Sequence, residues 1–86
     1  MRISVDLDDP GKSLFDEIVA RGAQQTIKVF VDGREVQFVV TADTEEGFVL
    51  RHDVDEHGEI KAGFEETVKV TDHGRVEIEF EGVRHG

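Results

Sequence analysis

The chain has 86 residues and no cysteine, and its 20 acidic and 10 basic side chains give a formal net charge of −10. This length predicts one domain, residues 1–86, with a core too small to enclose a large cofactor. The absence of cysteine excludes disulfides and thiolate metal sites. The negative charge disfavours direct contact with nucleic acid or an anionic membrane surface and would attract a basic protein partner.

The first 25 residues predict one strand and one helix. Apolar residues at every second position from Ile3 to Leu7 predict a strand over residues 2–7. Ser13 is expected to cap the helix that follows, and Gly22 to end it. The predicted buried face of this helix consists of Leu14, Phe15, Ile18 and Val19.

Residues 26–81 read as short alternating strands separated by acidic glycine turns. Asp32-Gly33 predicts a tight hairpin turn between strands at 26–31 and 35–41, because both residues accept positive φ angles. Further strands are predicted at 48–52, 66–71 and 75–81, and 59–64 is read as a short edge strand. Residues 82–86 are expected to form a loose tail.

These elements predict a β-rich α+β domain. Short turns between neighbouring strands favour an antiparallel meander sheet of about five to six strands, with the one N-terminal helix packed on it. A small closed β-barrel is the alternative, because Phe30 and Val39 interrupt the alternation and need burial elsewhere.

Two segments resemble known ligand-binding loops without their full residue sets. Gly11-Lys12-Ser13 precedes a helix as in a phosphate-binding loop, but the glycine required five positions earlier is Asp6. Residues 53–58 begin like a calcium loop, yet the fifth position is His57 and the twelfth is Phe64. We therefore interpret the first as a helix start and the second as an acidic hairpin loop.

The histidines and serines of the sequence do not follow the spacing of a known metal-binding or catalytic site. The four histidines, His52, His57, His73 and His85, are interpreted as turn and surface residues, since no third ligand has a fixed spacing to them. The only serines are Ser4 and Ser13, and neither lies in a nucleophile elbow. The sequence thus predicts no catalytic, cofactor-binding or metal-binding residues, and we expect a protein that is not an enzyme.

Three turn-rich segments between residues 29 and 80 carry a family resemblance. They are the run Val31-Asp32-Gly33-Arg34-Glu35-Val36, the run from Ala42 to Val49, and Gly74-Arg75-Val76-Glu77-Ile78. This stretch resembles small uncharacterised proteins encoded by tailed phages and prophages. The resemblance implies an origin in such a genome, and it implies no activity or site residues.

The preferred hypothesis is a non-enzymatic phage or prophage protein that binds other proteins, as a minor virion component or an assembly accessory. Its partner would be a virion or host protein, and its location the host cytoplasm or the virion. Self-association is a further expectation, because the core is small and Phe30 or Phe64 would sit at the surface. A sheet edge could pair with the partner.

The alternative hypothesis is an acidic inhibitor that mimics nucleic acid and occupies the groove of a host DNA- or RNA-binding protein. Glu77, Glu79 and Glu81 would lie about 6–7 Å apart along one strand face, close to the phosphate spacing of a single strand. For both hypotheses the candidate interaction surface is the same, namely Glu77, Glu79, Glu81, Asp43, Glu45, Glu46, Asp53, Asp55 and Phe64.

Overall fold

A computed structural model describes residues 1–22, 27–54, 57 and 68–86. Within these residues the protein is strand-rich α+β, as predicted, with one helix and eight strands. In chain order these are β1 (Arg2–Ser4), α1 (Lys12–Ala20), β2 (Lys28–Val31), β3 (Arg34–Val36), β4 (Val39–Asp43), β5 (Phe48–His52), β6 (Lys69–His73), β7 (Val76–Phe80) and β8 (Val83–His85).

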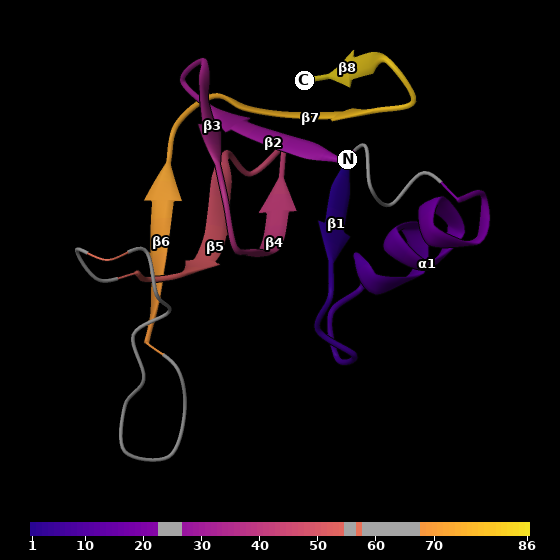
Figure 1. The fold of residues 1–86 in the computed structure, drawn as a ribbon, viewed down its shortest axis with the longest axis horizontal. Helices are drawn as coiled ribbons and strands as arrows, with labels where there is room; N and C mark the ends of the chain where they lie inside the picture. The colour runs from indigo at the N-terminus through magenta and orange to yellow at the C-terminus, as the bar shows by residue number, and fades with distance from the viewer. Residues whose placement is uncertain (23–26, 55–56, 58–67) are drawn as a thin grey trace.

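The strands form two antiparallel sheets and not the single meander that the sequence predicted. One sheet has the order β1-β4-β5-β6 and the other the order β3-β2-β7-β8. Figure 1 shows β2 and β7 running across the molecule above β4, β5 and β6, which run up and down. No described strand of one sheet pairs with a strand of the other, so the predicted alternative of a closed barrel is also wrong.

The meander prediction fails at Phe38, where one predicted strand becomes two. Residues 35–41 were expected to be continuous, but β3 ends at Val36 and β4 begins at Val39 in the other sheet. Phe38 has a φ of 60°, a left-handed conformation that turns the chain out of the first sheet. The register of β4 on β5 then shifts between Val39 and Thr41, where the irregularity bends the strand further.

The hairpin turn at Asp32-Gly33 is confirmed. The two residues have φ angles of 51° and 83°, and the flanking pair Val31 and Arg34 lies directly opposite in the ladder. Two consecutive positive φ angles give the turn the twist that matches the strands on either side. The sequence signal was decisive here because it is local.

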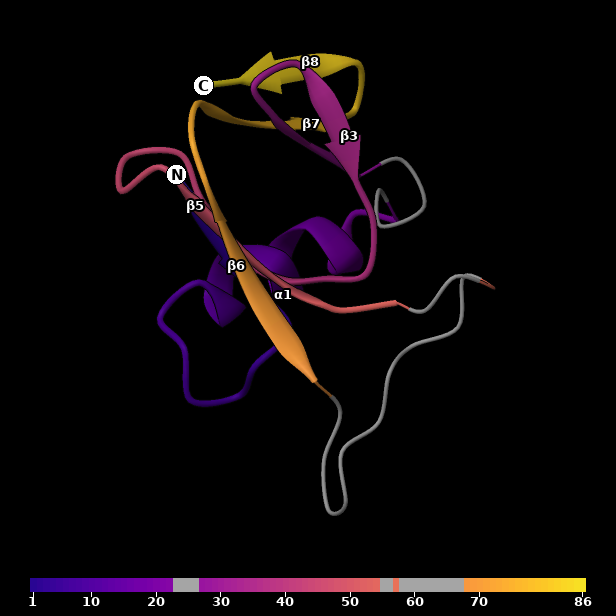
Figure 2. The same ribbon diagram turned by 90° about the vertical axis from the view of Figure 1, so that its left-hand side faces the viewer.

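The core lies between the two sheets and is closed at one end by α1. Apolar side chains from both sheets meet there, among them Val29, Val49, Val76 and Ile78, and Ile18 of α1 is fully buried against them. Figure 2 shows α1 lying behind the strands of the first sheet. The helix thus covers the core at the β1 side, and it does not cover the β6 side.

The helix begins two residues earlier than predicted. Gly11 occupies the N-cap position without a side-chain cap, and Ser13 lies exposed inside the helix. A side chain at Gly11 would meet the Ile3 backbone at 2.9 Å, so close packing of the two segments requires glycine. Gly22 ends the helix with a φ of 76°, as predicted. Val19, predicted to be buried, is exposed.

The first and the last strand of the chain differ from the sequence prediction. The first strand stops at Ser4, and Leu7 is 84% exposed in the loop that follows, so residues 2–7 do not form one strand. Residues 82–86, predicted as a loose tail, contain β8, which pairs with β7 from Phe80 to Ile78. His85 stacks on Phe80 with ring centroids 4.9 Å apart. The predicted edge strand at 59–64 lies outside the described residues.

The conformation of Gly33 gives a test of the hairpin. Gly33→Ala should lower the free energy of unfolding by about 1 kcal/mol, because an L-residue is strained at this φ, while the space around Gly33 is open. D-Alanine at position 33, introduced by chemical synthesis, should cause no loss, and urea unfolding of the two proteins measures the difference. Equal destabilisation by L- and D-alanine would contradict the left-handed turn.

Candidate functional site

The residues of the predicted acidic surface are spread over separate places. Glu45 and Glu46 are exposed in the turn between β4 and β5, and Glu45 lies 3.5 Å from the amino group of Met1. Asp53 is half-buried after β5, with its carboxylate 4.0 Å from Arg51. Asp55 and Phe64 lie outside the described residues. The described members therefore do not gather into one surface.

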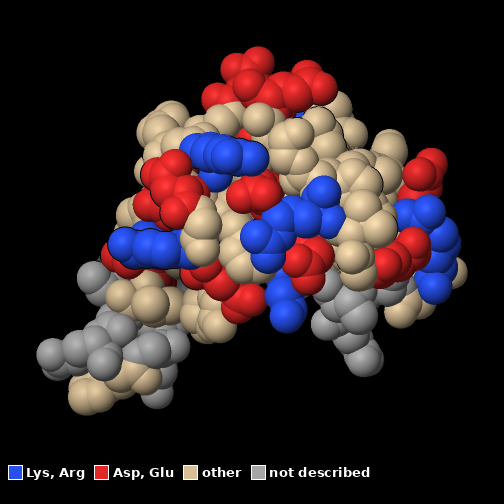
Figure 3. Space-filling model, turned by 90° about the horizontal axis from the view of Figure 1, so that it is seen from above, with Lys and Arg blue, Asp and Glu red and all other residues tan. Residues whose placement is uncertain are grey.

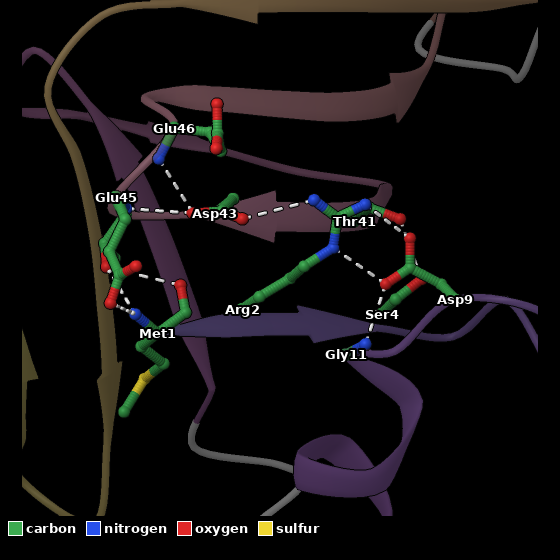
Figure 4. Close-up of polar contacts among 10 residues, drawn as sticks. Met1, Arg2, Ser4, Asp9, Gly11, Thr41, Asp43, Glu45 and Glu46 are labelled. Atoms are coloured by element: carbon green, nitrogen blue, oxygen red, sulfur yellow. Dashed lines mark hydrogen bonds and ion pairs between the residues drawn. The ribbon is translucent and has the colours of Figure 1, made fainter.

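Asp43, another predicted surface residue, is 7% exposed, and its carboxylate makes hydrogen bonds inside the protein. Its Oδ1 accepts hydrogen bonds from the backbone N–H groups of Glu45 and Glu46, both at 2.9 Å. Its Oδ2 accepts one from Arg2 at 3.1 Å. The carboxylate thus shapes the β4–β5 turn from inside and joins it to Arg2 (Figure 4).

Arg2 joins Asp43 to the loop before the helix. Its guanidinium donates to both carboxylate oxygens of Asp9, at 2.8 and 2.6 Å, and Asp9 also accepts the N–H of Gly11 at 2.7 Å. The hydrogen bonds from Arg2 outweigh the effect of burial and lower the pKa of Asp9 to about 2. Burial would raise the pKa of Asp43, but the N–H of Glu46 and the Arg2 side chain together lower it.

The three glutamates around β7 are not a uniform acidic row. Glu77 and Glu79 lie half-buried on the outer face of the sheet, and the guanidinium of Arg84 donates to Glu79 at 3.1 Å. Glu81 lies beyond the strand in the following turn, with a φ of 54°, and its carboxylate is 3.4 Å from Arg21. Figure 3 shows acidic and basic side chains interspersed on this face. The expected placement of Glu81 on one strand face with the other two is wrong.

A groove of about 550 Å³ opens between the two sheets on the side away from α1. One wall is the β2–β3 hairpin with the connection through Phe38, and the other is formed by β5 and β6. Its lining includes Arg34, Phe38, Arg51, Asp72 and His73. A second hollow of about 280 Å³, near α1 and β1, is lined by apolar side chains and Ser4 alone.

Phe38 is the largest apolar side chain in the lining of this groove. It is 43% exposed although it is aromatic, and its φ of 60° is unusual for a bulky residue. A residue held in such a conformation costs on the order of 1–3 kcal/mol, and such residues concentrate at binding sites. The chain reversal between the sheets thus presents an aromatic ring at the groove.

Two of the three carboxylates that line the groove, Asp32 and Asp72, accept hydrogen bonds, and the third, Glu35, is exposed. Asp72 accepts a hydrogen bond from Nε of Arg51 at 2.6 Å, and this contact raises the pKa of the guanidinium. Asp32 accepts the backbone N–H of Arg75 at 2.9 Å. Arg34 lies directly opposite Val31 of the neighbouring strand, and no ion pair or side-chain hydrogen bond of Arg34 occurs among the described residues.

The groove was missed by sequence reasoning, which placed Val36, Phe38 and Val40 on one strand face. Instead Val36 packs against the core, Phe38 is exposed, and Val40 is buried in the other sheet. The signal that could have revealed the change is the adjacent apolar pair Val39 and Val40, which no single alternating strand can bury on one side.

The described fold is an open two-sheet α+β protein with a lateral groove. Comparisons of the chain with protein-family models, with curated proteins and with solved structures found no match. Among the described residues, no helix is long and apolar enough to cross a membrane, and no three histidine or acidic side chains are grouped to bind a metal.

The Arg2 network predicts a stability that depends on pH. The pKa of Asp9 is lower in the folded than in the unfolded protein, so its stabilisation is complete above about pH 4 and is lost as the pH falls towards about 2. Asp9→Asn should lower the free energy of unfolding by about 2 kcal/mol at pH 7 and flatten its decline in acid. Urea unfolding between pH 2 and 7 measures both effects.

Asp8→Asn provides the matched control, because Asp8 is the exposed neighbour of Asp9. It removes the same charge and should leave both the stability at neutral pH and the acid slope close to those of the original protein. An Asp9→Asn protein with an unchanged acid slope would show that the Arg2 contacts do not stabilise the fold.

Proposed function

We propose that this protein is a non-enzymatic protein-binding module that uses the groove between its two sheets as the binding site. The observation that carries the proposal is Phe38, an exposed aromatic residue in a strained conformation that lines the groove. Aromatic residues contribute strongly to protein interfaces, because they offer large apolar area with few rotatable bonds. The free-energy cost of the strained backbone at Phe38 is offset when a partner buries the ring.

The engagement of Asp32 and Asp72, two of the three carboxylates in the groove lining, supports binding more than catalysis. A general acid or base needs a titrating group free to exchange its proton with a substrate. Asp72 is held by Arg51 and Asp32 by the N–H of Arg75, so both carboxylates serve to fix the groove walls. A rigid groove beside an exposed ring fits a docking role.

The biological setting of the proposal comes from the resemblance to phage and prophage proteins. In that setting the module acts as a minor virion component or as an assembly accessory, in the host cytoplasm or the virion. Its partner is a virion or host protein, and a second copy of the chain is the alternative occupant. Nucleic-acid mimicry is the weaker hypothesis, because Glu79 and Glu81 are each close to an arginine.

Site-specific photocrosslinking tests the proposal. A benzoylphenylalanine residue at position 38, introduced in the source cells, should give one discrete crosslinked partner on irradiation. The same residue at position 7 is the matched control, since Leu7 is exposed but does not line the groove. Mass spectrometry of the crosslinked bands identifies the partner.

Phe38→Gly gives the corresponding binding test. We expect affinity for the crosslinked partner to fall about tenfold or more, as when an aromatic anchor is removed. The free energy of unfolding should change by less than about 1 kcal/mol, because relief of the left-handed strain offsets the lost contact area. Crosslinking equally from positions 7 and 38, or from neither, would refute a binding site at the groove.

A further inference from the structure

The turn between β2 and β3 holds the one Asp-Gly sequence of the chain, Asp32-Gly33, and the chain has no asparagine. An aspartate that precedes glycine isomerises readily, because glycine has no side chain to hinder attack of its backbone nitrogen on the aspartate carboxyl carbon. Both residues are exposed, and the space around Gly33 is open. Sequence and exposure alone therefore mark Asp32 as a site of spontaneous covalent change.

Two hydrogen bonds tie Asp32 to the connection between β6 and β7. Its backbone N–H donates to the C=O of Arg75 at 2.9 Å, and its Oδ1 accepts the N–H of Arg75, also at 2.9 Å. In Figure 1 the tip of the β2–β3 hairpin lies beside this connection. The backbone and the side chain of Asp32 are thus both held by the same neighbouring residue.

Gly74 leaves the space in which the Asp32 carboxylate lies. A Cβ atom at position 74 would meet the two carboxylate oxygens at 2.6 and 2.8 Å. The backbone of Gly74 is itself held, because its N–H donates to Gly47 at 3.0 Å. A methyl group at position 74 would therefore push the carboxylate away from the N–H of Arg75, since a short side chain moves more readily than the backbone.

We propose that Asp32 is a site of isoaspartate formation, and that its hydrogen bonds to Arg75 hold the reaction back in the folded protein. The nitrogen of Gly33 bonds to the carboxyl carbon of Asp32, and the carboxyl OH and the amide hydrogen leave as one water molecule. A second water molecule then adds to the former backbone carbonyl carbon of Asp32 and breaks its bond to the Gly33 nitrogen. The chain now runs through the side-chain carbon of Asp32, with its mass and oxidation state unchanged.

The modification would alter one wall of the groove. Isoaspartate adds one carbon atom to the main chain inside a two-residue turn, whose flanking residues Val31 and Arg34 lie directly opposite each other. The ladder must shift to accommodate it, because the length of the turn sets the register of a hairpin. Val31, Asp32 and Arg34 all line the groove. The inference does not depend on the protein-binding function proposed above, since it concerns a reaction of the chain with itself and water.

Incubation of the full chain at neutral pH, followed by digestion and electron-transfer fragmentation, measures isoaspartate at position 32. The reaction requires the carboxyl group to leave Arg75 and turn towards Gly33. The folded protein should therefore form isoaspartate about tenfold or more slowly than the same chain in guanidinium chloride, where both hydrogen bonds are absent.

Gly74→Ala tests the role of the contact with Arg75. It should accelerate the reaction in the folded protein about fivefold or more, because the added methyl group displaces the Asp32 carboxylate. Gly82→Ala is the matched control, since Gly82 lies in the β7–β8 turn with a φ of 77° and no atom within 4 Å of an added Cβ. It should change the rate less than about twofold, provided that the variant stays folded.

Amide exchange at Arg75 gives a measurement that needs no substitution and decides alone if Gly74→Ala does not fold. Guanidinium concentrations below the unfolding transition should raise exchange at Arg75 and isomerisation at Asp32 by the same factor, to within about twofold, because both require the same opening. Equal reaction rates in the folded and denatured chain, or equal effects of Gly74→Ala and Gly82→Ala, would overturn the inference. So would faster exchange at Arg75 without faster isomerisation, or a denatured chain that forms no isoaspartate.

Discussion

The reversal of the chain at Phe38 is the constraint on which the rest of the structure depends. Because this residue adopts a left-handed φ, β3 and β4 belong to different sheets although only two residues separate them. The two sheets can then pack their apolar faces together around one small core. The same reversal keeps β3 away from β6, so the sheets do not close and a groove is left between them.

The distribution of charge follows from the way in which the two sheets are held. Most described basic side chains are used internally, as in Arg2 with Asp9 and Asp43, or Arg51 with Asp72. These contacts fix loops and turns without adding positive charge to the surface. Four described cations, Lys28, Arg34, Lys69 and Arg75, make no such contact within the described residues, and of these Arg34 lines the groove.

Much of the fold could be predicted from the sequence, because local chemistry specifies its pieces. Asp32-Gly33 identified the hairpin turn, and the alternation of Val76, Ile78 and Phe80 identified β7 with its buried face. The assignment of strands to sheets was not predicted, because it depends on one positive φ at Phe38, and the adjacent apolar pair Val39 and Val40 was the one sign of it in the sequence.

The candidate site was harder to predict for a related reason. Asp43 looked like a surface carboxylate in an acidic turn, whereas its burial depends on Arg2, which is distant in the sequence. The groove itself arises where two sheets fail to meet, and Arg34, Phe38 and His73 come together there from separate elements. Periodicity describes each strand on its own and cannot show which edges stay open.

Residue-resolved hydrogen exchange of the protein without a partner tests the central claim, that the sheets stay open between β3 and β6. The open structure predicts alternating protection along β6, with slow exchange at Val70 and Asp72 and fast exchange at Lys69, Thr71 and His73. It also predicts slow exchange from Glu77 to Phe80 in β7, because β2 and β8 pair with this part of the strand from its two sides. Slow exchange at all five amides of β6 would mean that this edge is paired, and would contradict the groove and the function proposed for it.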